Sequence, residues 1–87
     1  MCRNITTLRG LEPPATSEEI EAAARQYVRK VSGVTRPTPA TEAAFEQAVA
    51  TIAQATAEVL QGLPPRRQPP KADPPLRRPE VRARMHR

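Results

Sequence analysis

The stretch TSEEIEAAARQYVRKVSG, residues 16–33, decides the fold of this chain. It opens with a T-x-x-E capping box, in which Thr16 and Glu19 satisfy each other's free backbone amides at a helix start. Gly33 supplies the left-handed stop that commonly ends a helix. We therefore predict a helix over residues 17–32. Its apolar residues share one face at helical spacing: Ile20, Ala24, Tyr27, Val28 and Val31.

A second helix is predicted for residues 39–61. Thr38, which Pro39 holds extended, has the backbone that an N-cap needs, and Pro39 suits the first helical position. Gly62 ends the helix. Its apolar side is made of Phe45, Val49, Ile52, Thr56, Val59 and Leu60.

The residues before the first helix indicate one short helical turn over residues 4–8. Asn4 can cap it, Gly10 can stop it, and Leu11 can fold back onto it. Two long helices behind a short leading turn predict an all-α fold, an antiparallel two-helix hairpin that occupies residues 1–63.

Residues 64–87 have a different character. They carry eight Arg and Lys against Asp73 and Glu80, a net charge of +6, whereas residues 1–63 carry six against seven glutamates, a net charge of −1. Seven of the eleven prolines fall in this segment, mostly as pairs five residues apart, and none stand three apart as in PxxP ligands. We predict an extended or disordered basic, proline-rich tail.

Size and composition exclude several classes of protein. A body of this length buries only ~60% of the surface of its unfolded chain. The single cysteine cannot form a disulfide within the chain, and there is no apolar run of the ~20 residues that a bilayer span needs. One Cys and one His make no metal cluster, and the three glycines lie at helix ends rather than in a phosphate loop. We expect a cytoplasmic, non-enzymatic protein without cofactor, metal or membrane partner.

The tail holds the candidate binding residues. Cations on an extended backbone can neutralise several phosphates with little dependence on sequence. The tail has no aromatic residue, so base stacking adds nothing, and a tail that only solubilises or tethers is the alternative. The candidate anion- or nucleic-acid-binding residues are Arg66, Arg67, Lys71, Arg77, Arg78, Arg82 and Arg84.

Two further features have weaker functional interpretations. Removal of Met1 would leave Cys2 as a possible reactive thiol, but the only histidine is His86, and a small apolar or inert surface residue is the plainer interpretation. A basic group could receive an acidic partner, or simply offset the helix dipole and face solvent. It consists of Arg25, Arg29, Lys30 and Arg36.

The chain resembles a family of short bacterial proteins of unknown function, and the resemblance covers the body and fits the tail. The residues that carry it are Met1-Cys2-Arg3-Asn4-Ile5, Glu12-Pro13-Pro14-Ala15-Thr16, Val28-Arg29-Lys30-Val31-Ser32-Gly33 and Ala43-Ala44-Phe45-Glu46. This resemblance implies no particular activity.

A more distant resemblance is to the J-domain of Hsp70 co-chaperones. It rests on Leu8-Arg9-Gly10-Leu11 followed by Pro14-Ala15-Thr16-Ser17-Glu18-Glu19-Ile20, on Ala24-Arg25-Gln26-Tyr27, and on Phe45 with Ile52. It implies the same hairpin. The His-Pro-Asp tripeptide of J-domains is missing, since residues 31–37 read VSGVTRP, so stimulation of the Hsp70 ATPase is not expected.

These observations favour a small binding module whose tail engages an acidic partner, with RNA or a ribonucleoprotein as the leading expectation. The alternative is a J-like protein-interaction or assembly module, in which a partner protein or a second copy covers the small core.

Overall fold

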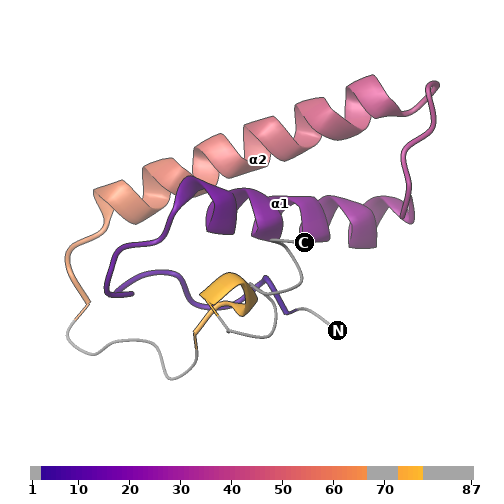
Figure 1. Cartoon of the computed structure of the whole chain (residues 1–87). Helices are drawn as coiled ribbons and strands as arrows, with labels where there is room; N and C mark the ends of the chain where they lie inside the picture. Colours follow the sequence, from indigo (N-terminus) through magenta and orange to yellow (C-terminus); the bar gives the residue numbers. More distant parts are fainter. Residues whose placement is uncertain (1–2, 67–72, 78–87) are drawn as a thin grey trace.

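The protein, described here by a computed structural model, is an antiparallel hairpin of two helices. Helix α1 spans Ser17–Ser32, helix α2 spans Glu42–Gly62, and a short 3-10 helix, η1, spans Pro75–Arg77. The structure describes residues 3–66 and 73–77, and these ranges contain no strand. The predicted all-α class and the helical hairpin are confirmed (Figure 1).

Helix α1 forms as its sequence predicts. The amide of Glu19 donates to Thr16 Oγ1 (3.1 Å) and the amide of Thr16 donates to Glu19 Oε1 (2.9 Å), which completes the capping box. Gly33 has φ +74° and its amide donates to Arg29 O (3.0 Å). Part of the predicted apolar face is nevertheless exposed, since Tyr27 and Val31 of this face have 48% and 66% of their surface accessible.

Helix α2 begins three residues later than predicted. The carbonyl of Thr38 accepts from the amides of Thr41 (2.9 Å) and Glu42 (2.8 Å), so Pro39–Thr41 form a turn that leads into the helix. Thr41, not Thr38, is the N-cap, and its hydroxyl accepts from the Thr38 amide (2.8 Å) instead of capping α2.

The core consists of two clusters along the hairpin. Toward the loop between the helices, Ala24 and Val28 of α1 pack on Phe45 and Val49 of α2. At the other end, where α1 begins and α2 ends, the second cluster joins Leu8, Leu11 and Ile20, with Ala57 and Leu60 packed against it. The N-terminal segment therefore completes the core at that end.

The predicted helical turn over residues 4–8 is wrong. The segment is irregular, and the amides of Asn4 and Ile5 both donate to Gln26 Oε1 of α1 (2.8 and 3.1 Å). The side chain of Gln26 thus provides the hydrogen-bond acceptor for these backbone amides, and Leu8 and Leu11 are still buried in the core. Gly10 has the left-handed backbone expected of it (φ +89°).

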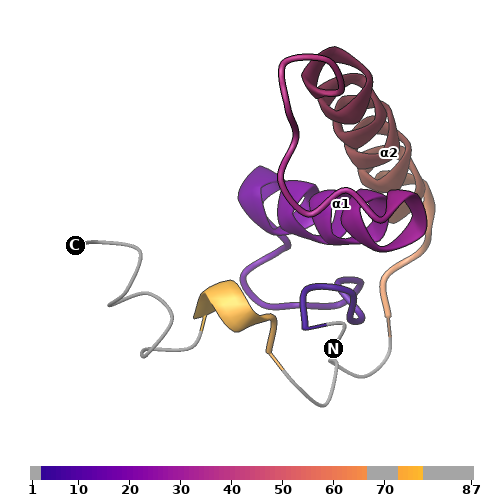
Figure 2. The same ribbon diagram turned by 90° about the vertical axis from the view of Figure 1, so that its right-hand side faces the viewer.

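Part of the tail packs on the body, in contrast to the predicted extended or disordered segment. Pro74 and Pro75 are buried, and η1 lies beside the N-terminal segment in both views (Figures 1 and 2). Helix α2 ends at Gly62, next to the predicted domain boundary at Leu63.

Candidate functional site

An arginine of the tail is bound to the start of α1. Arg77 Nε donates to Glu19 Oε2 (2.7 Å) and its Nη2 donates to Glu19 Oε1 (3.1 Å). The same Nη2 lies within hydrogen-bond distance of the carbonyls of Pro13 (2.7 Å) and Pro14 (3.2 Å). We call this contact the tail anchor. It joins residues 58 positions apart and fixes η1 against the capping box.

Glu19 is the buried member of the tail anchor, with 4% of its surface exposed. The hydrogen bonds from Arg77 lower the pKa of Glu19 below its usual value, and the Thr16 amide acts in the same direction, against the opposing effect of burial. Glu19 in turn raises the pKa of Arg77. Both groups are therefore charged at neutral pH.

A second arginine fixes the base of the tail. Arg9 Nη2 and Nε both donate to the carbonyl of Pro64, at 2.7 and 3.1 Å. Because the acceptor is a neutral carbonyl, this contact holds the Arg9 guanidinium in place without pairing it with a negative charge. Arg66, two residues on, lies over Gly10, where a Cβ would come within 2.9 Å of Arg66 Cβ.

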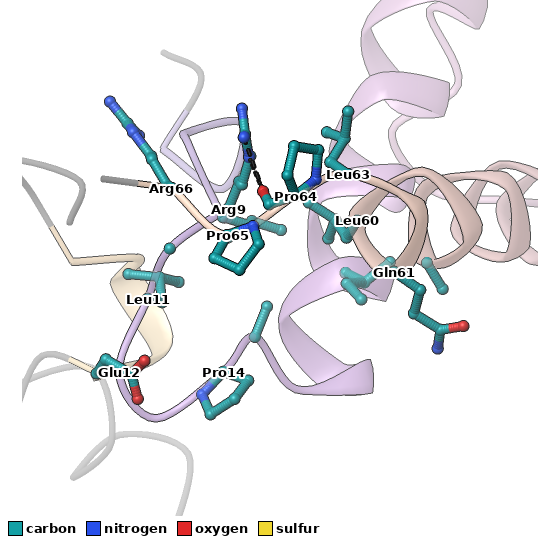
Figure 3. A pocket seen from close by; sticks show the side chains of 15 residues that line it. Arg9, Leu11, Glu12, Pro14, Leu60, Gln61, Leu63, Pro64, Pro65 and Arg66 are labelled. Carbon is teal, nitrogen blue, oxygen red and sulfur yellow. Dashed lines mark hydrogen bonds between the residues drawn. The ribbon is translucent and has the colours of Figure 1, made fainter. Parts of the chain in front are cut away.

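Arg9 and Arg66 stand beside a pocket of about 460 Å³ at the end of the hairpin where α1 begins and α2 ends. Their side chains extend to the same side, away from Glu12 at the other end of the pocket (Figure 3). Between them the lining is mainly aliphatic: Leu8, Leu11, Ala15, Ile20, Ala57, Leu60, Leu63, Pro64 and Pro65. We call this the basic-rimmed pocket. The ion pairs of the described residues involve neither Arg9 nor Arg66.

The structure separates the predicted tail residues. Arg66 is exposed, whereas Arg77 is engaged by Glu19 inside the chain and does not present a free guanidinium. The other predicted site residues lie outside the described ranges: Cys2, Arg67, Lys71, Arg78, Arg82 and Arg84.

The basic group at the end of α1 is also divided. Arg25 donates to Glu46 at 2.7 and 2.9 Å and to Glu21 at 3.1 Å, and its guanidinium lies over the Phe45 ring. Its hydrogen bonds lower the pKa of Glu46. The other three members, Arg29, Lys30 and Arg36, are exposed.

Sequence reasoning missed Arg9 and the second role of Glu19. The sequence places Arg9 directly before Gly10 but does not indicate which carbonyl its side chain reaches. It identifies Glu19 as a capping residue but does not indicate a partner 58 positions away. In the described ranges, no three His, Cys, Asp or Glu side chains are placed to share a metal ion, and neither helix is long and apolar enough to cross a membrane.

The fold and the site define a small all-α protein, a helical hairpin to which part of a basic tail is fixed by arginine contacts. The chain belongs to the family described as uncharacterized conserved protein (DUF2277), whose model matches residues 1–84. No curated protein and no solved structure matches it significantly.

Proposed function

We propose that this protein is a non-enzymatic cytoplasmic binding module whose basic tail engages an acidic partner, RNA or a ribonucleoprotein. The observation that carries the proposal is the division of charge, −1 in residues 1–63 against +6 in residues 64–87. Cations concentrated in this way bind phosphates by releasing condensed counterions.

The tail anchor supports this proposal by giving the tail cations a fixed starting point. Arg77 is neutralised by Glu19, and Arg78 follows it directly in the sequence. Anchoring part of a basic segment lowers the entropy that is lost when the remainder binds. The proposal assigns to the anionic partner the tail cations other than Arg77: Arg66, Arg67, Lys71, Arg78, Arg82, Arg84 and Arg87.

Fluorescence anisotropy with a labelled single-stranded oligouridine tests the proposal. A variant with glutamine at Arg67, Lys71, Arg78 and Arg82 keeps the tail anchor and Arg66 intact. For each cation that contacts phosphate, the slope of log K against log salt should become shallower by about 0.7. Arg36→Gln, in the loop between the helices, is the control for loss of a distant charge. An unchanged slope in the tail variant contradicts the proposal.

A second candidate, a J-like protein-interaction module without Hsp70-stimulating activity, is favoured by an apolar groove. The groove, about 290 Å³, lies between the N-terminal segment and the two helices, and its lining includes Ile5, Tyr27 and Ile52. Ile5 and Tyr27 are 44% and 48% exposed, an unusual state for large apolar side chains that lie together.

Light scattering over a range of concentrations tests whether a second copy covers this groove. Tyr27→Ser would then shift the protein toward monomer, whereas Val59→Ser, also at an exposed apolar site, would not. A wild-type protein that stays monomeric at all concentrations rules out the homodimer.

A further inference from the structure

We propose that the basic-rimmed pocket is a docking site for an acidic segment of a partner protein, in which an aliphatic side chain stands next to a carboxylate. The site is on the folded body, apart from the tail cations beyond Arg66. The inference goes beyond the proposed binding of RNA by the tail and does not depend on it.

The rim of the pocket supplies two positive charges, and one of them is fixed in place. The Arg9 guanidinium is held by two hydrogen bonds to Pro64 O, while the aliphatic stem of Arg66 lies over Gly10, where a Cβ would come within 2.9 Å of Arg66 Cβ. An arginine that is fixed before binding loses less entropy when it pairs with a carboxylate. The acceptor of Arg9 is a neutral carbonyl, and the ion pairs of the described residues include neither Arg9 nor Arg66.

The floor of the pocket determines which acidic partner fits. Leu11 and Ile20, which are buried, line the pocket together with Leu60 and with Leu63, which has 42% of its surface exposed. An aliphatic side chain of the partner would cover these groups and remove apolar surface from water on both molecules. A nucleotide would find no aromatic ring here on which to stack its base, because the pocket lining contains none.

The one acidic residue in the pocket lining, Glu12, lies away from the two arginines of the rim. Glu12 lies at the opposite end of the pocket from the guanidinium groups (Figure 3). A carboxylate at the Arg9–Arg66 rim is thus attracted by two nearby charges and repelled by one more distant charge, and the Coulomb interaction weakens with distance.

The probe is a fluorescein-labelled peptide of sequence Glu-Leu-Glu-Glu-Leu-Glu, titrated with the full chain. We expect binding that is lost when either glutamine replaces the glutamates or alanine replaces the leucines. Such a double requirement separates this pocket from a purely electrostatic surface, for which the leucines would not matter.

Two variants locate the binding to the pocket. Leu63→Ala should weaken the complex about three- to tenfold, because its side chain would be covered by the peptide. Arg66→Gln should weaken it about two- to fivefold. Leu63 and Arg66 are exposed in the free protein, so neither change removes a core residue. Arg9 is left intact because it also fixes the tail.

Matched controls and opposite outcomes complete the experiment. Val59→Ala removes an exposed aliphatic group of α2 outside the pocket, and Arg36→Gln removes a distant charge, so both should bind the peptide as the wild type does. Equal losses in Val59→Ala and Leu63→Ala, or peptide affinity unchanged by Leu63→Ala, would overturn the proposal. The proposal would also be overturned if oligouridine displaced the peptide and if Leu63→Ala weakened oligouridine binding as much as it weakened peptide binding.

Discussion

Glu19 shows how one residue serves two parts of the molecule. Its carboxylate accepts from the Thr16 amide in the capping box and from Arg77 in the tail anchor. A buried carboxylate that loses its partners is strongly destabilising, because its desolvation is then uncompensated. The start of α1 and the position of η1 are therefore coupled through a single side chain.

This coupling gives the stability of the protein a defined pH dependence. The folded-state pKa of Glu19 is lowered, so its contribution is complete above the unfolded value of about 4.3 and is lost as the pH falls through the folded value. Urea unfolding of the wild type and of Glu19→Gln should show a difference in the free energy of unfolding that shrinks below about pH 4.3. A difference independent of pH would mean that the charge of Glu19 contributes nothing.

Gly10 and Gly33 provide a matched pair of substitutions. Both have positive φ, so alanine costs about 1–2 kcal/mol at either from the backbone alone. At Gly10 the new Cβ also meets Arg66 Cβ at 2.9 Å, whereas at Gly33 it meets nothing within 4 Å. Chemical denaturation should therefore find Gly10→Ala the more destabilising of the two. Equal losses would show that Arg66 does not rest on Gly10.

At the scale of the element, the two helix starts differ in how they are fixed. Thr16 caps α1 with its side chain, while the hydroxyl of Thr41 is occupied by the Thr38 amide at the start of α2. Thr16→Ala should lower the free energy of unfolding by about 1 kcal/mol, and Thr16→Ser, which keeps the hydroxyl, by less. Thermal unfolding followed by circular dichroism measures both. If Thr16→Ser lowered the free energy of unfolding as much as Thr16→Ala, the stabilisation would come from packing of the Thr16 methyl group and not from the cap.

The same contrast explains which elements could be predicted from the sequence. Helix α1 is specified by contacts within a few residues, namely the T-x-x-E box and Gly33, and its bounds agree with the prediction. Helix α2 has no side-chain cap of this kind at its start, and it begins at Glu42 rather than at the predicted residue 39. Residues 4–8 were expected to be helical because Asn4 can cap, but their amides bond to Gln26 across more than twenty positions, which local patterns cannot show.

The candidate sites follow the same rule. The excess of cations beyond Leu63 was visible in the composition, and so was Arg66 as one of them. The long-range contacts were not visible there: Arg77 of the tail pairs with Glu19, and Arg9 of the N-terminal segment donates to the Pro64 carbonyl. Nothing in the spacing of the arginines distinguishes Arg77 from Arg78.

At the scale of the whole molecule, part of the tail that was predicted to be extended or disordered packs on the body, and we expect it to stabilise the fold. Deleting residues 67–87 removes the buried Pro74 and Pro75 and the tail anchor, while Glu19 regains water. We expect the free energy of unfolding to fall by about 1–3 kcal/mol, the range for losing a hydrogen bond to a charged group together with some apolar burial.

Arg77→Ala in the full chain should lower the free energy of unfolding by no more than the deletion does, because a released η1 exposes Glu19 to water in both variants. Urea unfolding compares the three proteins. Arg77→Lys, which keeps the charge but not the paired contacts with Glu19, should fall between the wild type and Arg77→Ala. A deletion variant as stable as the full chain would show that residues 73–77 lie on the body without holding it.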